Sequence, residues 1–160
     1  MPDERVPADF YDPHDYTPSQ SVGYLMRRAV MGLMQETSRL LEPVGLTNAQ
    51  WAPMFKLHLG KGSTVAELAR ELEMDPGATT RLLDRLEAKG LCRRVRSEVD
   101  RRVVNVELTE EGTRVAQHIP EALSRVMNAQ LSGFTRDEWQ TFKGFLLRMI
   151  DNAEAGRSSS

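Results

Sequence analysis

The sequence predicts a mainly α-helical fold in which two short helices and a β-hairpin are flanked by long helices at both ends of the chain. Three observations support this prediction. Apolar residues recur at helical spacing, four Thr-x-x-Glu/Gln patterns mark helix starts, and the spacing changes to alternation only within residues 91–108. Two short helices followed by a two-stranded hairpin are the order of a winged helix-turn-helix.

The four threonine patterns locate the helix starts. A threonine followed three residues later by Glu or Gln can satisfy the free backbone N–H groups of a first helical turn. The pattern begins at Thr17, Thr47, Thr64 and Thr135. Together with the apolar spacing it predicts helices over residues 18–42, 48–59, 65–73, 76–89, 110–131 and 136–153. Pro53 and Pro120 fall inside two of these helices and are expected to kink them, because proline lacks a backbone donor.

The segment LCRRVRSEVDRRVVNVELT departs from the helical spacing. Apolar positions between residues 91 and 95 mark one candidate strand, and Val104, Val106 and Leu108 alternate along a second. The polar residues 97–100 form the turn between them. This segment therefore predicts a β-hairpin, the wing, with arginines at its tip.

The composition is that of a soluble globular protein, with 40% hydrophobic and 28% charged residues. The chain lacks a run of about 18 apolar residues that could span a membrane. Its acidic, proline-rich N-terminus does not resemble a signal peptide. The one cysteine, Cys92, cannot form a disulfide framework, so the reducing cytoplasm is the expected location.

The net charge of −2 conceals a strong local asymmetry. Residues 1–18 carry five acidic side chains against one arginine, together with four prolines, which predicts an extended arm. Residues 81–102 carry eight Arg or Lys side chains against four acidic ones. A dense basic patch on a near-neutral chain is typical of a nucleic-acid-binding surface. The alternative, a solvated charged face, fits scattered charge better.

The helix predicted over residues 76–89 has two different sides. At about 100° per residue, the apolar Leu82, Leu83 and Leu86 share one side with Thr79. Asp75 can cap the helix, and the other side is small or hydrogen-bonding at first and then basic. Such a helix can enter the major groove, where arginine forms two hydrogen bonds with guanine. The candidate DNA-contacting residues are Pro76, Gly77, Ala78, Thr80, Arg81, Asp84 and Arg85.

The arginines of the hairpin continue the same basic surface. Arg94, Arg96, Arg101 and Arg102 are candidate contacts to the minor groove or the phosphate backbone. Asp100 is too acidic to touch DNA favourably, so we expect it to fix the wing by pairing with an arginine. Double-stranded DNA is therefore the predicted partner. The alternative is a winged-helix module that binds another protein.

The segment ELARELEMDPGATTRLLDRLEAKGLCRRVRSEVDRRVVNVELTEEG resembles the core of the MarR family of bacterial transcriptional regulators. Its specific marks are the helix TRLLDRLEAKGL and a wing in which Asp100 and Arg102 precede a strand ending in Leu108, Thr109 and Gly112. The resemblance covers about residues 20–152. It implies an obligate homodimer formed by the first and last helices, and a repressor released by a small aromatic or phenolic carboxylate or by an oxidant. The acidic arm and Pro53 depart from the family pattern.

The expected organisation has three parts. Residues 1–18 form an N-terminal arm, residues 19–45 and 110–155 form a dimerisation region, and residues 46–109 form the DNA-binding domain. A two-fold dimer presents two identical recognition helices, so an inverted-repeat operator is expected, with half-site centres about 10 bp apart. The resemblance implies a bacterial cytoplasmic protein.

Core packing is the default interpretation of the apolar residues on the first two predicted helices. The family resemblance raises a second one, an effector pocket between the dimerisation helices and the DNA-binding domain, with an arginine pairing the carboxylate of the ligand. Its candidate lining is Arg27, Arg28, Met31, Met34, Trp51, Met54 and His58. A DNA binder without any effector is a further alternative.

Other chemistries have little support in the sequence. The three histidines lie far apart and lack the spacing of a metal site, and the chain has neither a phosphate-binding glycine loop nor a nucleophile motif. No enzyme activity, metal or cofactor is therefore predicted. Cys92 lies beside arginines that could lower its pKa, which leaves redox sensing open against the simpler reading of a half-buried small residue.

Overall fold

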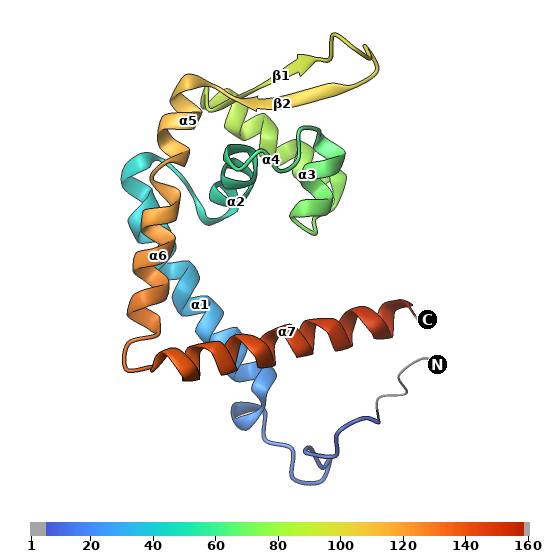
Figure 1. Ribbon diagram of the computed structural model, residues 1–160, viewed down its shortest axis with the longest axis vertical. Coiled ribbons are helices and arrows are strands. Elements are labelled where there is room, and N and C mark those ends of the chain that lie inside the picture. The colour runs from blue at the N-terminus through green and yellow to red at the C-terminus, as the bar shows by residue number, and fades with distance from the viewer. Residues whose placement is uncertain (1–5, 159–160) are drawn as a thin grey trace.

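The computed structural model describes residues 6–158, which form seven α-helices, two short 3-10 helices and one β-hairpin. In chain order these are η1 (Pro18–Gln20), α1 (Val22–Leu41), η2 (Glu42–Val44), α2 (Asn48–His58), α3 (Val65–Glu71), α4 (Pro76–Ala88), β1 (Cys92–Arg96), β2 (Val104–Leu108), α5 (Glu110–Ala116), α6 (Ile119–Gln130) and α7 (Arg136–Ser158). Figure 1 shows the hairpin with α2 to α5 at one end of the molecule. Helices α1 and α6 pack together and lead away from this end, and α7 extends alone from the turn after α6. The predicted winged helix-turn-helix is confirmed.

Three of the four threonine patterns begin helices as predicted, at α2, α3 and α7. The fourth, at Thr17, leads only into the 3-10 turn η1. Helix α1 begins after Ser21, whose Oγ accepts a hydrogen bond from the N–H of Tyr24 at 3.2 Å. The predicted helix start at residue 18 is therefore wrong, because a serine supplies the cap closer to the apolar helix.

The two prolines affect their helices differently. Pro120 lies in the first turn of α6, where no N–H donor is required, and the single helix predicted over residues 110–131 is divided there into α5 and α6. The prediction of one continuous helix is therefore wrong. Pro53 lies buried inside α2, and this helix continues through it from Asn48 to His58.

One apolar core joins the base of the hairpin to the surrounding helices. Four side chains of α4 are buried, and they are the four predicted from the spacing: Thr79, Leu82, Leu83 and Leu86, each at most 2% exposed. Leu83 and Leu86 share the cluster with Met54 of α2 and Val106 of β2. This burial holds α4 by one side and leaves its other side free.

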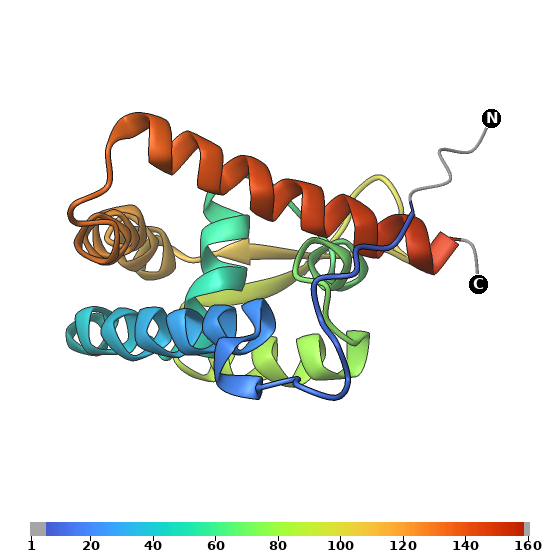
Figure 2. The same ribbon diagram turned by 90° about the horizontal axis from the view of Figure 1, so that it is seen from below.

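The terminal helices leave many apolar side chains uncovered. Helix α7 has no fully buried residue over its described side chains. It crosses α1 in the view of Figure 1, and Figure 2 shows that it lies apart from α1. Phe145 is 52% exposed and Leu25 of α1 is 51% exposed, with Val22, Phe142 and Met149 similarly open. Contiguous exposed apolar surface of this kind marks an interaction site. None of the helices within residues 6–158 is long and apolar enough to cross a membrane.

Candidate nucleic-acid interface

Helix α4 presents its N-terminal half to solvent on a rigid support. Asp75 caps it, its Oδ1 accepting a hydrogen bond from the N–H of Ala78 at 2.9 Å, and Pro76 takes the first position. The side opposite the core carries the exposed Pro76, Gly77, Thr80, Arg81, Asp84 and Arg85, with Ala78 half-buried. The free N–H groups and positive dipole of a helix start favour a negatively charged group here.

Arg81 folds back over the first turn of α4. A Cβ atom at Gly77 would lie 3.6 Å from its Nη1 and 3.1 Å from Oδ1 of Asp75. The guanidinium therefore lies beside the helix start, at ordinary contact distance from position 77. The tip of α4 thus carries the Arg81 guanidinium together with the carboxylate of Asp75, which caps the helix.

The tip of the hairpin is closed by backbone hydrogen bonds between Ser97 and Val103 and between Val103 and Asp100, each 2.9 Å long. The carboxylate of Asp100 accepts a further bond from the backbone N–H of Arg102 at 2.9 Å. Among the described residues Asp100 forms no ion pair, so the expected pairing with an arginine side chain is wrong. Asp100 holds the turn through the backbone instead, as aspartate commonly does.

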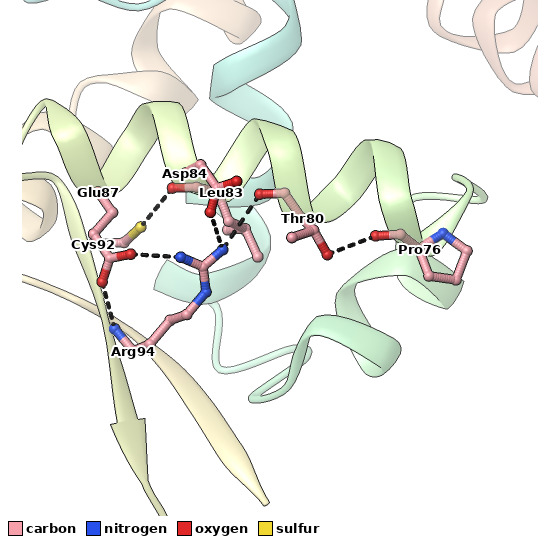
Figure 3. Close-up of polar contacts among 7 residues, drawn as sticks. All are labelled: Pro76, Thr80, Leu83, Asp84, Glu87, Cys92 and Arg94. Atoms are coloured by element: carbon pink, nitrogen blue, oxygen red, sulfur yellow. Dashed lines mark hydrogen bonds and ion pairs between the residues drawn. The ribbon is translucent and has the colours of Figure 1, made fainter.

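Arg94 is placed differently from the other wing arginines (Figure 3). Its Nη1 lies 2.5 Å from Oε2 of Glu87, and its Nη2 lies 2.7 Å from Oδ1 of Asp84 and 3.3 Å from the carbonyl oxygen of Thr80. Its backbone N–H donates to Oε1 of Glu87 at 3.0 Å. The expectation that Arg94 reaches DNA as a free cation therefore does not fit its geometry, because its guanidinium is already bonded to α4. The expectation that Asp84 contacts DNA does not fit either, because its carboxylate is bonded to Arg94.

These contacts also shift the pKa values of Arg94 and Cys92. Burial alone would lower the pKa of Arg94, but hydrogen bonds and charge from Asp84 and Glu87 raise it above the ordinary value. Burial, together with the charge of Glu87, raises the pKa of the Cys92 thiol to about 11, although Arg94 opposes the shift. Cys92 is only 2% exposed. The structure therefore supports a buried, protonated thiol and not the low-pKa sensor that the neighbouring arginines left open.

Five of the six candidate arginines on α4 and the wing are not held in an ion pair within the described residues. Within residues 6–158, none of Arg81, Arg85, Arg96, Arg101 and Arg102 forms an ion pair, and all five are exposed. They come from α4 and from the hairpin that packs beside it. Because β1 packs on α4, the free arginines of the helix and of the hairpin lie on adjoining elements.

Comparison with known proteins identifies the family of this chain. The MarR family model matches residues 46–104. The HTH-type transcriptional repressor MdtR of Bacillus subtilis is 32% identical over 106 residues, covering 66% of this chain and 68% of that protein. The multiple antibiotic resistance protein MarR of Escherichia coli is 30% identical over 128 residues, covering 77% of this chain and 89% of that protein. The chain belongs to the MarR family. Members of this family are transcriptional regulators and not enzymes.

A solved structure extends the likeness to a complex. The crystal structure of a mutant MarR from Escherichia coli bound to operator DNA has 28% sequence identity and a TM-score of 0.72, covering 80% of this chain and 91% of that one. The likeness to the MarR fold therefore extends over most of the present chain, well beyond the residues of the family-model match.

The structure divides the expected effector-pocket residues of this MarR-family chain between the core and the exposed surface. Met54 is fully buried in the core, so its proposed place in a ligand-accessible lining is wrong. Trp51 packs against the same core, whereas Met31 and Met34 are exposed on α1. The cavities described within residues 6–158 lie elsewhere, for example a space of about 340 Å³ around Arg136, and none includes any of the seven residues.

One functional residue escaped the sequence analysis of this MarR-family chain. Glu87 lies one turn after Asp84 on α4, and it forms the shortest contact with Arg94. The spacing of the two acids on one side of a helix was visible, but their shared partner comes from β1. Only the packing of the strand against the helix shows that the three residues belong together.

Proposed function

We propose that this chain is a homodimeric, sequence-specific DNA-binding repressor of the MarR family. The observation that carries the proposal is the set of five exposed arginines on α4 and the adjoining wing, none of which forms an ion pair within the described residues. In this proposal α4 enters the major groove, where Arg81 and Arg85 read base edges together with Gly77 and Thr80. The wing arginines Arg96, Arg101 and Arg102 reach the adjacent minor groove or phosphates.

The proposed dimer is formed by α1 and α7. Their exposed apolar side chains include Leu25, Phe142 and Phe145, and α7 has too little contact with its own chain to be stabilised there. A second copy that covers these faces would supply the missing burial, at about 25 cal/mol for each Å² of apolar surface. A two-fold dimer presents two copies of α4, which supports an inverted-repeat operator.

The proposal also includes repression of transcription and its release by a small molecule. The repressor role is supported by the similarity to a transcriptional repressor of Bacillus subtilis. A small aromatic carboxylate is the proposed effector. Arg27 and Arg28 are exposed on α1 without an ion pair in the described residues, near the exposed Met31 and Met34. Together they offer a charge and an apolar surface at the proposed dimer interface.

Selection from random DNA duplexes tests the proposal. The purified chain should retain duplexes that share an inverted repeat with half-site centres about 10 bp apart, and the complex should contain two chains per duplex. Salicylate or another small aromatic acid should weaken the complex. Two results together would favour the protein-interaction module instead. The chain would retain no duplex at low salt, and replacement of the wing arginines would leave its binding to a protein partner unchanged.

A further inference from the structure

We propose that Arg94 is a positioning residue that holds the wing against α4, so that Arg81 and the wing arginines face one surface. It acts on DNA binding through this geometry and not by touching DNA. Its effect on DNA binding rests on the proposed function, whereas its effect on the wing does not.

The contacts of Arg94 span two turns of α4. The guanidinium bonds to Thr80, Asp84 and Glu87, which lie successively along the helix (Figure 3). The backbone N–H at the same position bonds to the second oxygen of Glu87. Both the side chain and the strand are thus attached to the helix. The planar guanidinium makes its bonds from two separate nitrogens, whereas an ammonium would have to make them all from one.

The neighbouring arginine of β1 shows how specific this arrangement is. Arg93 points to the other face of the hairpin, where it pairs with Glu107 of β2 at 3.1 Å, and its side chain is 64% exposed. The side chain of Arg94 is 25% exposed. Arg93 therefore stabilises the hairpin within itself, whereas Arg94 attaches the hairpin to the recognition helix.

Movement of Arg94 toward DNA would be unfavourable. It would leave Asp84 and Glu87 without a counter-charge on the side of α4 that carries the basic surface. Two unpaired carboxylates would then repel the phosphates that the surface is proposed to bind. The ion pairs are therefore expected to persist when DNA is bound.

Cys92 provides a reporter that does not require DNA. It lies at the start of β1, and its Sγ donates a long hydrogen bond to the carbonyl oxygen of Leu83 at 3.8 Å. The thiol is buried between the strand and α4. Separation of the wing from the helix would open the thiol to solvent and increase its rate of modification.

The first experiment measures this modification by dithionitrobenzoate in the free protein. Arg94→Gln and the double variant Asp84→Asn with Glu87→Gln should each react about tenfold faster than the wild type. Arg93→Gln, the matched control, should react at the wild-type rate. An unchanged rate in Arg94→Gln would overturn the proposal, whether or not the protein binds DNA.

The second experiment titrates the same variants with the selected inverted-repeat duplex at several salt concentrations. Both the Arg94→Gln and the double variant should bind about tenfold more weakly, with an unchanged salt slope, and combining them should add little. A slope lower by about one unit per subunit in Arg94→Gln would mean a direct phosphate contact. Tighter DNA binding by the double variant would also indicate that Arg94 contacts the phosphates directly. Either result would overturn the proposal.

The conservative variant Arg94→Lys separates geometry from charge and guards against a variant that fails to fold. It keeps the positive charge but loses the paired hydrogen bonds, so both of its readouts should lie between those of the wild type and Arg94→Gln. Helical circular dichroism should be unchanged. Full wild-type behaviour of Arg94→Lys would show that charge alone suffices and would contradict the positioning role. If the wild type binds no duplex, the proposed function fails while the thiol measurement still tests Arg94.

Discussion

Gly112 at the start of α5 lies against the backbone of Leu91 at the end of the turn that follows α4. A Cβ atom at position 112 would lie 1.8 Å from the carbonyl oxygen of Leu91, far inside van der Waals contact. The same carbonyl accepts the N–H of Thr109 at 3.1 Å, and the Thr109 hydroxyl donates to the carbonyl oxygen of Gly90 at 2.7 Å. This contact ties both ends of the hairpin to α5.

Replacement of Gly112 by alanine should destabilise the protein strongly. The clash is with backbone that hydrogen bonds hold in place, so we expect a loss of about 3 kcal/mol, at the upper end of the range for overpacked sites. Thermal unfolding should show a lower midpoint. Gly144→Ala is the control, because a Cβ there meets nothing within 4 Å and alanine favours a helix. Equal stability of the two variants would contradict the steric argument.

Arg81→Ala should alter which sequences are bound. Its guanidinium lies at the tip of α4, where guanine edges are within reach in the proposed complex. The loss should cost about 1–3 kcal/mol on the selected site and relax discrimination at one base pair of each half-site. Titrations against single-base variants of the duplex measure this. A uniform loss across all sequences would instead assign Arg81 to the phosphates.

Arg102→Ala should weaken binding to all sequences more evenly and reduce the salt slope by about one unit per subunit. Asp100→Ala should reproduce part of this defect, because it removes the acceptor that orients the backbone at Arg102. Asp100→Asn keeps an acceptor oxygen and should retain more affinity. Tighter binding by Asp100→Ala would show that the loss of negative charge matters more than the shape of the wing.

The exposed apolar side of α7 should be required for the dimer. Phe145→Lys places a charge where 52% of a phenylalanine is now exposed, and it should shift the chain from dimer to monomer or aggregate in sedimentation velocity. Gln140→Lys, also exposed but about 140° away from Phe145 around α7, should leave the dimer intact. A stable, DNA-binding monomer of Phe145→Lys would contradict the proposed interface.

The raised pKa of Cys92, about 11, predicts a slowly reacting thiol and a pH effect. A model thiol has a pKa of 9.0, so between these values the unfolded chain has released a proton that the folded chain retains. The unfolded state binds fewer protons there, and the contribution of Cys92 to stability is therefore lost as the pH rises from about 9 to 11. Comparison of urea unfolding of the wild type and Cys92→Ala over this range measures the effect. An equal pH dependence of both proteins would exclude it.

The sequence by itself determined the order of the elements, the buried side of α4 and the charge of the surface opposite. These features follow from short-range rules, since the spacing of Leu82, Leu83 and Leu86 specifies one helix side and Thr64 or Asp75 supplies a local cap. The capping pattern at Thr17 failed because a competing cap, Ser21, lies four residues further along the same chain.

Only the tertiary structure decided what individual charged and apolar residues of the site do. Arg94 and Arg96 are alike in the sequence, but Arg94 meets Asp84 and Glu87 because β1 packs on α4, whereas Arg96 lies beyond their reach and remains free. Met54 likewise became core and not pocket through the approach of α4 and the hairpin to α2. The physical reason is that ion pairing and burial depend on distances between segments far apart in the chain, which local spacing does not specify.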